Sequence, residues 1–159
     1  MPANPVLFQT LFNHYINIPH CRWLKIYGDS SSDEPVISVD WRDELLESPK
    51  TGNIHGGVIT TLVDMASACT LAALFQQFET TATLDMRIDY LMQPVPDQPI
   101  HVRAHCYRQE GSIAFIRSHC FQNDETRPFA LGMSTFIHNP LTQAEQQALQ
   151  AYLQQEQAK

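Results

Sequence analysis

A single carboxylate interrupts a long apolar segment of the chain. Residues 58–75 are apolar or small, and Asp64 is the one acidic or basic residue among them. A carboxylate is costly to bury unless it is paired, hydrogen-bonded or engaged in a reaction. The segment directly follows His55-Gly56-Gly57. We therefore expect a reactive carboxylate on a helix that begins with two glycines, and a hydrogen-bonded structural acid is the alternative.

The two glycines offer backbone groups that a ligand could reach. The first amides of a helix have no intrahelical acceptor, and the helix dipole adds partial positive charge there. Because Gly56 and Gly57 carry no side chain, a carbonyl oxygen or an anion could approach these amides closely. The alternative is that the pair only permits a tight turn into the helix.

The spacing of Gly56 and Asp64 restricts how they could act together. Eight residues separate them, which corresponds to about 12 Å along a helix. One carbonyl group cannot touch both within one helix. If both act on the same bond, two antiparallel helices from two subunits must contribute one group each, as a two-fold homodimer allows.

The helix that carries these groups has two different faces. One stripe holds Gly57, Thr60, Thr61, Asp64, Ser67 and Ala68, and another holds Val58, Leu62, Met65, Cys69 and Ala72. The small side chains leave space beside Asp64, where Thr61 and Ser67 could also bond it as a structural acid. The segment approaches the length of a membrane span, but Asp64 and its small polar residues make a poor lipid-facing helix. We expect it to be buried in protein.

The remaining segments predict a sheet that covers this helix. Residues 4–18 have the spacing of an amphipathic helix that ends before Pro19, and residues 45–53 form a loop. The tail from Thr142 has helical propensity, and Thr142 with Glu145 three residues later could cap its start. Strands are expected at 22–28 and 34–41, which form a hairpin, and at 83–92, 100–109, 113–121 and 129–137. The order indicates an α+β domain, with 83–92 as a long half-buried strand.

Composition narrows the class of protein. The 159 residues suit one domain, with helical segments at 1–20 and 141–159. A net charge of -7 without a basic cluster argues against a nucleic-acid partner. The four cysteines form no CxxC or CxxH pair, and no basic region followed by an apolar run opens the chain, so we expect a reduced, cytoplasmic protein without a membrane partner. His101 and His105 are spaced poorly for a shared metal, and we expect none.

Two motifs together resemble a known family. The run His55-Gly56-Gly57 with Asp64, followed by the strand at 82–91, resembles the hotdog-fold thioesterases of the phenylacetate-pathway type. Glu110-Gly111-Ser112 and residues 130–134 extend the resemblance, which covers about residues 20 to 138. It implies a hotdog fold, in which a curved antiparallel sheet wraps around one long central helix. It also implies homodimers, and a homotetramer built from two dimers is plausible.

The resemblance also implies roles for individual residues. In similar proteins the first glycine after the histidine donates its amide to the thioester carbonyl, and the helix acid of the partner subunit attacks or activates water. These roles fall on Gly56 and Asp64, with His55 shaping the helix entry and Thr83 near the attacking water. Relatives usually carry Asn or Gln six residues before the histidine, where this chain has Pro49, or Ser48 if one loop residue is inserted. Asn53 is the candidate replacement.

The expected function is therefore hydrolysis of a small to medium acyl-CoA or aryl-acyl-CoA, with no cofactor beyond the CoA of the substrate. A non-catalytic acyl-CoA-binding or sensing module on the same fold is the alternative, and a hydratase or dehydratase is a third reading that lacks its usual His with Asp or Glu. The expected substrate pocket is lined by Gly57, Thr61, Met65, Ala68, Leu71, Phe75 and Met86. Candidate cations for the CoA phosphates are Arg87, Arg103, Arg108 and Arg117.

Overall fold

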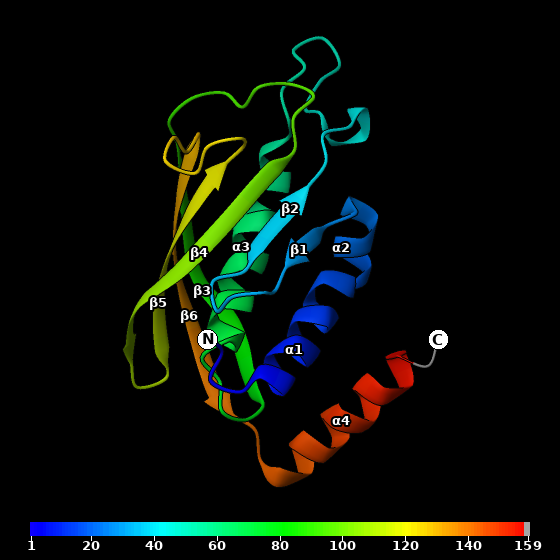
Figure 1. Cartoon of the computed structure of the whole chain (residues 1–159), viewed down its shortest axis with the longest axis vertical. Helices are drawn as coiled ribbons and strands as arrows, with labels where there is room; N and C mark the ends of the chain where they lie inside the picture. Colours follow the sequence, from blue (N-terminus) through cyan, green and yellow to red (C-terminus); the bar gives the residue numbers. More distant parts are fainter. Residues whose placement is uncertain (158–159) are drawn as a thin grey trace.

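A computed structural model describes residues 1–157 of the chain (Figure 1). The helices are α1 (Pro5–Asn17), α2 (Pro19–Leu24), α3 (Gly56–Ala72) and α4 (Gln143–Gln157), with a short 3-10 helix at Asp43–Leu45. The strands are β1 (Tyr27–Asp29), β2 (Val36–Val39), β3 (Glu79–Tyr90), β4 (Ile100–Glu110), β5 (Ile113–Phe121) and β6 (Ala130–Pro140). They form one six-stranded antiparallel sheet in the order β1-β2-β4-β5-β6-β3.

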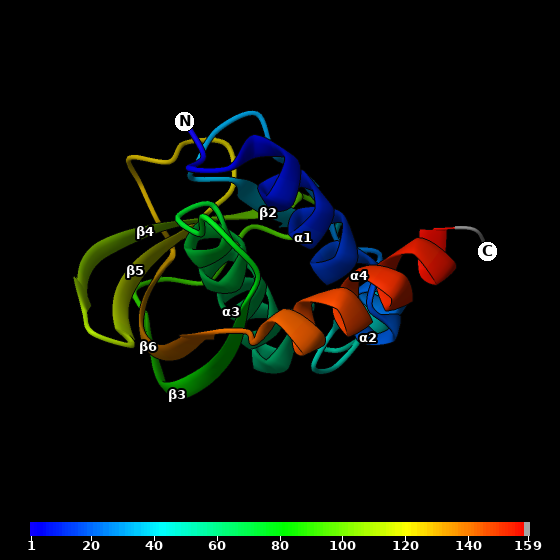
Figure 2. The same ribbon diagram turned by 90° about the horizontal axis from the view of Figure 1, so that it is seen from below.

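The sheet curves around α3, as the view from below shows (Figure 2). Burial alternates along β4 and β5, so that Val102 and Ile116 are fully buried while the residues next to them are not, and Ile37 of β2 is fully buried as well. Leu62 and Val63 of α3 are likewise fully buried. Complete burial of a leucine side chain contributes roughly 2 kcal/mol to folding. The core therefore lies between α3 and the concave face of the sheet.

This architecture is the α+β hotdog fold that the resemblance implied, with α3 as the central helix. The helix begins at Gly56 and ends at Ala72, so it starts two residues before the apolar run and ends three residues before Phe75. The strands predicted after the helix are confirmed in β3, β4, β5 and β6. Among the described residues, no helix has both the length and the apolar character that crossing a membrane requires.

The prediction of a strand over residues 22–28 is wrong for its first half, because α2 occupies Pro19–Leu24. Pro19 lies at the helix start, where its missing N–H costs nothing and its fixed φ suits the helix. The helix ends at Leu24, and the next residue, Lys25, caps it with a left-handed φ of 54°. The hairpin itself is real but short, since β1 pairs with β2 over three residues.

The strand predicted to be half-buried lies at the edge of the sheet. Among the sheet's strands, β3 pairs only with β6, and none of its side chains is buried. Leu84, at a register shift in the pairing with β6, is 56% exposed, and Tyr90 is 54% exposed. Met86 and Ile88 alone pack partly against the core. The predicted alternation therefore holds only for Met86 and Ile88. At the register shift between Thr83 and Asp85, Leu84 is exposed and Thr83 instead bonds Asp64 of α3.

The two terminal helices lie beside each other outside the central helix (Figure 2). Asn4 caps α1 by accepting a hydrogen bond from the amide of Leu7. The predicted cap of α4 is present, because the Glu145 carboxylate accepts bonds from the amide and the hydroxyl of Thr142. Leu153 of α4 is 5% exposed and belongs to the core. Residues 158 and 159 of the predicted helical tail lie outside the described residues.

Candidate active site

The first turn of α3 leaves one backbone amide available. His55 caps the helix twice: its Nδ1 accepts from the amide of Gly57 at 3.0 Å, and its carbonyl accepts from the amide of Val58 at 2.9 Å. The amide of Gly56 makes no hydrogen bond to any described residue. His55 thus orients the helix start through its side chain, and the free donor at this end is Gly56.

A groove of about 400 Å³ opens beside this amide. Its wall includes Glu47, Asn53, Gly56, Ile59 and Tyr90. A Cβ on Gly56 would lie 3.2 Å from the Tyr90 hydroxyl, so the missing side chain keeps space between the amide and that hydroxyl. Burial is the main cause that raises the pKa of Tyr90, which keeps its hydroxyl protonated near neutral pH.

The loop before α3 places Asn53, the candidate replacement, differently from Ser48 and Pro49. Asn53 lines the groove with Gly56, while Ser48 and Pro49 are absent from its wall. Ser48 instead supports its own turn, because its hydroxyl accepts from the amide of Lys50 and its carbonyl from the amide of Thr51. Glu47 also faces the groove and was missed by the sequence reasoning. No sequence motif includes Glu47, because it reaches the same groove as Gly56 only through the turn at 48–52.

Asp64 lies two turns further along α3 and is half-buried. The Thr83 hydroxyl of β3 donates to its Oδ1 at 2.7 Å. Its Oδ2 has no hydrogen-bond partner among the described residues. One oxygen is therefore held while the other remains able to accept a proton.

A histidine from α2, His20, contacts α3 at Thr61, between Gly56 and Asp64. The Thr61 hydroxyl donates to the carbonyl of Gly57 at 3.0 Å, so its oxygen accepts the bond from His20 Nε2 at 3.2 Å. His20 and Thr61 are 41 positions apart in the sequence. The sequence carries no signal for His20, because the short helix α2 brings it to Thr61.

The core takes up other residues of the predicted pocket. Ala68, Leu71 and Phe75 are at most 6% exposed and belong to the buried cluster, so they are not open to a ligand in the single chain. Met86 is half-buried at its edge. Ser67 is buried and hydrogen-bonds Ser134 and Ser118 across the sheet. Neither Thr61 nor Ser67 therefore satisfies Asp64, and the expectation of a local hydrogen-bonded structural acid is wrong in its partners.

The structure thus assembles two separate clusters on one helix. Asp64 and Thr83 form the first, and Gly56, Asn53 and Tyr90 form the second. About 12 Å of helix separates Gly56 from Asp64. A single carbonyl group cannot contact both clusters within one chain.

Other reactive side chains are accounted for elsewhere. Burial raises the pKa of the Cys21 thiol to about 11 and that of Cys120 to about 12, which makes both poor nucleophiles. Three of the arginines expected near CoA phosphates form ion pairs with carboxylates: Arg87 with Asp89, Arg103 with Glu125, and Arg108 with Glu110. Within residues 1–157, no three His, Cys, Asp or Glu side chains are grouped so that they could hold a metal ion.

Comparisons with known proteins find a matching family model and several similar structures. Residues 51–129 match the family model of the thioesterase superfamily. A Pseudomonas aeruginosa protein of known structure is 26% identical, with a TM-score of 0.72 over 82% of this chain and 98% of its own. Mouse thioesterase superfamily member 2 is 24% identical, with a TM-score of 0.65 over 82% of this chain and 96% of its own. A phenylacetic acid degradation-related protein from Ralstonia eutropha is 16% identical, with a TM-score of 0.68 over 82% and 98%. No curated protein matches the chain.

Proposed function

Because this chain is a hotdog-fold protein of the thioesterase superfamily, we propose that it is an acyl-CoA thioesterase acting on small to medium acyl or aryl-acyl groups. The observation that carries the proposal is the arrangement along α3: a free Gly56 amide at the helix start and a Thr83-bonded Asp64 carboxylate two turns later. The first suits a developing oxyanion, and the second suits a base or nucleophile.

The oxyanion would be stabilised by Gly56. Tetrahedral intermediates of acyl transfer carry negative charge on the former carbonyl oxygen, and a preorganised backbone donor stabilises that charge. The Gly56 amide has the helix dipole behind it and a groove in front of it. Asn53 in the same groove would help to orient the thioester or the water, in place of the amide residue usual in related sequences.

Asp64 would act as a base or as the nucleophile itself. In the first route, water oxygen bonds to the carbonyl carbon and its proton passes to Asp64. Collapse of the tetrahedral intermediate then breaks the carbon–sulfur bond, and the CoA thiolate takes up the proton. In the second route, the carboxylate attacks the carbonyl carbon, the carbon–sulfur bond breaks, and CoA leaves as the thiolate. Water then hydrolyses the mixed anhydride, which frees the acid and restores the Asp64 carboxylate, and the acid proton passes to the thiolate. Thr83 holds Oδ1 in both routes and leaves Oδ2 to react.

A homodimer would bring the two clusters together. The long edge strand β3 has a row of unpaired backbone groups along its free side and exposes Leu84 and Tyr90. Such an edge favours pairing with another chain. A second copy that pairs there in antiparallel fashion would place its Asp64 near Gly56 of the first, giving two equivalent sites. A tetramer built from two such dimers remains part of the proposal.

The test is release of thiol from short, medium, long and aromatic acyl-CoAs. We expect turnover with part of this panel and a loss of at least about 100-fold in Asp64→Asn, since a positioned base contributes roughly 10²–10⁴. Asp124→Asn is the matched control, because Thr126 also donates to its carboxylate, in an exposed turn. Acyl-CoA binding without turnover in the wild-type protein would instead support the non-catalytic binding module.

A further inference from the structure

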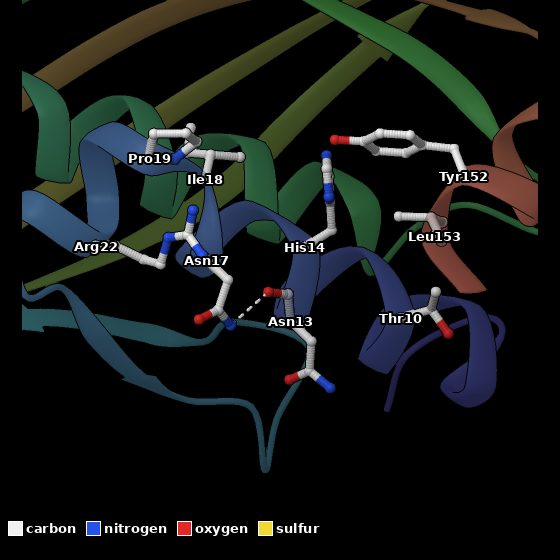
Figure 3. Close-up of a pocket in the computed structure, with 9 residues that line it drawn as sticks. All are labelled: Thr10, Asn13, His14, Asn17, Ile18, Pro19, Arg22, Tyr152 and Leu153. Atoms are coloured by element: carbon white, nitrogen blue, oxygen red, sulfur yellow. Dashed lines mark hydrogen bonds between the residues drawn. The ribbon is translucent and has the colours of Figure 1, made fainter. Parts of the chain in front are cut away.

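A second cleft lies between α1, the start of α2 and α4 (Figure 3). Its volume is about 520 Å³, within the range of sites that hold small organic ligands. The polar part of its wall consists of Thr10, Asn13, His14, Asn17, Arg22 and Tyr152. Ile18, Pro19 and Leu153 supply an apolar part. The cleft shares none of its lining residues with the groove at Gly56.

The charge of this cleft is opposite to that of the chain. The protein has a net charge of -7, yet residues 1–28 contain no Asp or Glu, and none of the described residues that line the cleft is acidic. Arg22 carries a permanent positive charge there. The local balance therefore favours a negatively charged ligand.

The hydrogen-bonding groups of the cleft that remain unused are mainly donors. The guanidinium of Arg22 makes no hydrogen bond or ion pair with any described residue, unlike that of Arg42, which donates to the carbonyls of Leu24 and Trp23. Asn13 Oδ1 already accepts from Gln9, which leaves the Asn13 amide nitrogen free to donate. The ring of His14 and the hydroxyl of Tyr152 are likewise unbonded within the described chain.

The side chains place one cationic group beside an apolar part of the cleft. Figure 3 shows Arg22 beside Ile18 and Pro19, while Tyr152 of α4 faces His14 and the amide of Asn13 points away from Arg22. The two rings meet edge to face, with their centroids 6.0 Å apart. Guanidinium groups bind carboxylate and phosphate oxygens through paired hydrogen bonds. Ile18, Pro19 and Leu153 lie where an apolar body attached to such a group could pack.

We propose that this cleft binds a small organic anion, with its carboxylate or phosphate on Arg22 and its apolar part against Ile18, Pro19 and Leu153. Both walls come from helices outside residues 51–129, the segment that matches the thioesterase superfamily. The site is separate from Gly56 and Asp64, so the inference stands whether or not the chain hydrolyses thioesters.

Calorimetric titration of the full chain tests this inference. The probes are benzoate and hexanoate as carboxylates, phenyl phosphate as a phosphate ester, and inorganic phosphate without an apolar body. We expect submillimolar binding of a probe that has both an anionic group and an apolar part, and much weaker binding of inorganic phosphate. The stronger class of probe then distinguishes a carboxylic acid from a phosphorylated compound as the ligand.

Two variants locate the binding. Arg22→Gln should weaken it at least about tenfold, because a charge-assisted bidentate contact is lost. Asn13→Asp keeps the size of the side chain and should also weaken binding, since it places a negative charge in the wall of the cleft. The matched control is Arg127→Gln, an exposed arginine in the turn between β5 and β6 with the same change of net charge.

Binding in Asp64→Asn should equal that in the wild type, because the cleft does not include Asp64. Absence of binding by all four probes would overturn the inference, and so would equal affinity in Arg22→Gln and wild type. A loss in Asp64→Asn with no loss in Arg22→Gln would instead assign the anion to the proposed active site.

Discussion

Gly56 and Asp64, at the two ends of one stripe on α3, differ in their chemistry. At the helix start, Gly56 provides a free amide and opens onto a groove. Two turns later, Asp64 provides a carboxylate that Thr83 holds by one oxygen. The first end can stabilise negative charge, and the second can accept a proton or attack a carbon.

This difference indicates a division of labour that one chain cannot complete. Helix geometry keeps the donor and the acid about 12 Å apart, however the side chains rotate. The free edge of β3 offers a way to bring the donor of one copy to the acid of another. The following predictions test whether the two ends act on one substrate.

Mixing two inactive variants has the largest expected effect. A dimer of an Asp64→Asn chain and a Gly56→Pro chain contains one site with both groups intact and one with both removed. If the sites are shared, mixed dimers recover about a quarter of wild-type activity, since half of the dimers are mixed and each has one working site. Thiol release after unfolding and refolding the two chains together measures the recovery.

A lack of recovery in the mixture would contradict shared sites. Activity of the mixture that stays at the sum of the two single variants would place both groups in one chain's site. Refolded wild-type protein is the control for losses during mixing.

Removing the Gly56 amide should cost about 100-fold or more in kcat, the usual effect of deleting an oxyanion donor. Gly56→Pro does this without breaking the helix, because proline suits the first helical position and His55 is already extended, with φ -66° and ψ 132°. Gly56→Ala is the matched variant, since it adds a Cβ near Tyr90 but keeps the amide. Steady-state kinetics of the two variants give the comparison.

If alanine is as damaging as proline, the loss comes from the added side chain and not from the missing donor. Equal thermal unfolding temperatures of the two variants would show that the helix start has kept its structure.

At the acid end, Thr83→Val should lower kcat about tenfold, because it removes a hydrogen bond to a charged group while nearly keeping the shape. Thr126→Val removes the corresponding bond to Asp124 in an exposed turn and should leave the rate unchanged. An unaltered rate in Thr83→Val would mean that the hydrogen bond from Thr83 to Asp64 Oδ1 does not contribute to catalysis.

The smallest expected effect is at His20, which bonds Thr61 between the two ends. His20→Ala should reduce kcat about threefold to tenfold, as loss of one neutral hydrogen bond typically costs about 1 kcal/mol. His20→Gln, which can still donate to Thr61, should restore most of the rate. His14→Gln, on the neighbouring helix, is the control. If Ala and Gln have the same effect, the hydrogen bond is not the cause.

Local features of the chain predicted most of the fold. The alternating residues of 100–109 and 113–121 and the apolar run after Gly57 correspond to β4, β5 and α3. The segment at 22–24 was predicted incorrectly, because its alternation over a few residues fits a strand as well as a one-turn helix. The decisive feature was Pro19, whose preference for a helix start outweighed that short pattern.

The site was predictable only where its chemistry is local. Gly56 and His55 could be paired because a helix start satisfies its own amides within a few residues. Asp64 and Thr83 were connected through the resemblance to hotdog thioesterases, and their 2.7 Å bond depends on how β3 lies beside α3. Glu47 and His20 carry no sequence signal, because a loop and a short helix bring them to the site.

The sequence by itself determined which groups are present and how far apart they lie along α3, since helical rise and side-chain period follow from covalent geometry. The tertiary structure decided which of these groups are accessible. It buried Ala68 and Leu71 in the core, left Gly56 open to a groove, and placed β3 at an unpaired edge. Accessibility depends on contacts between residues distant in sequence, and one stretch of chain does not specify them.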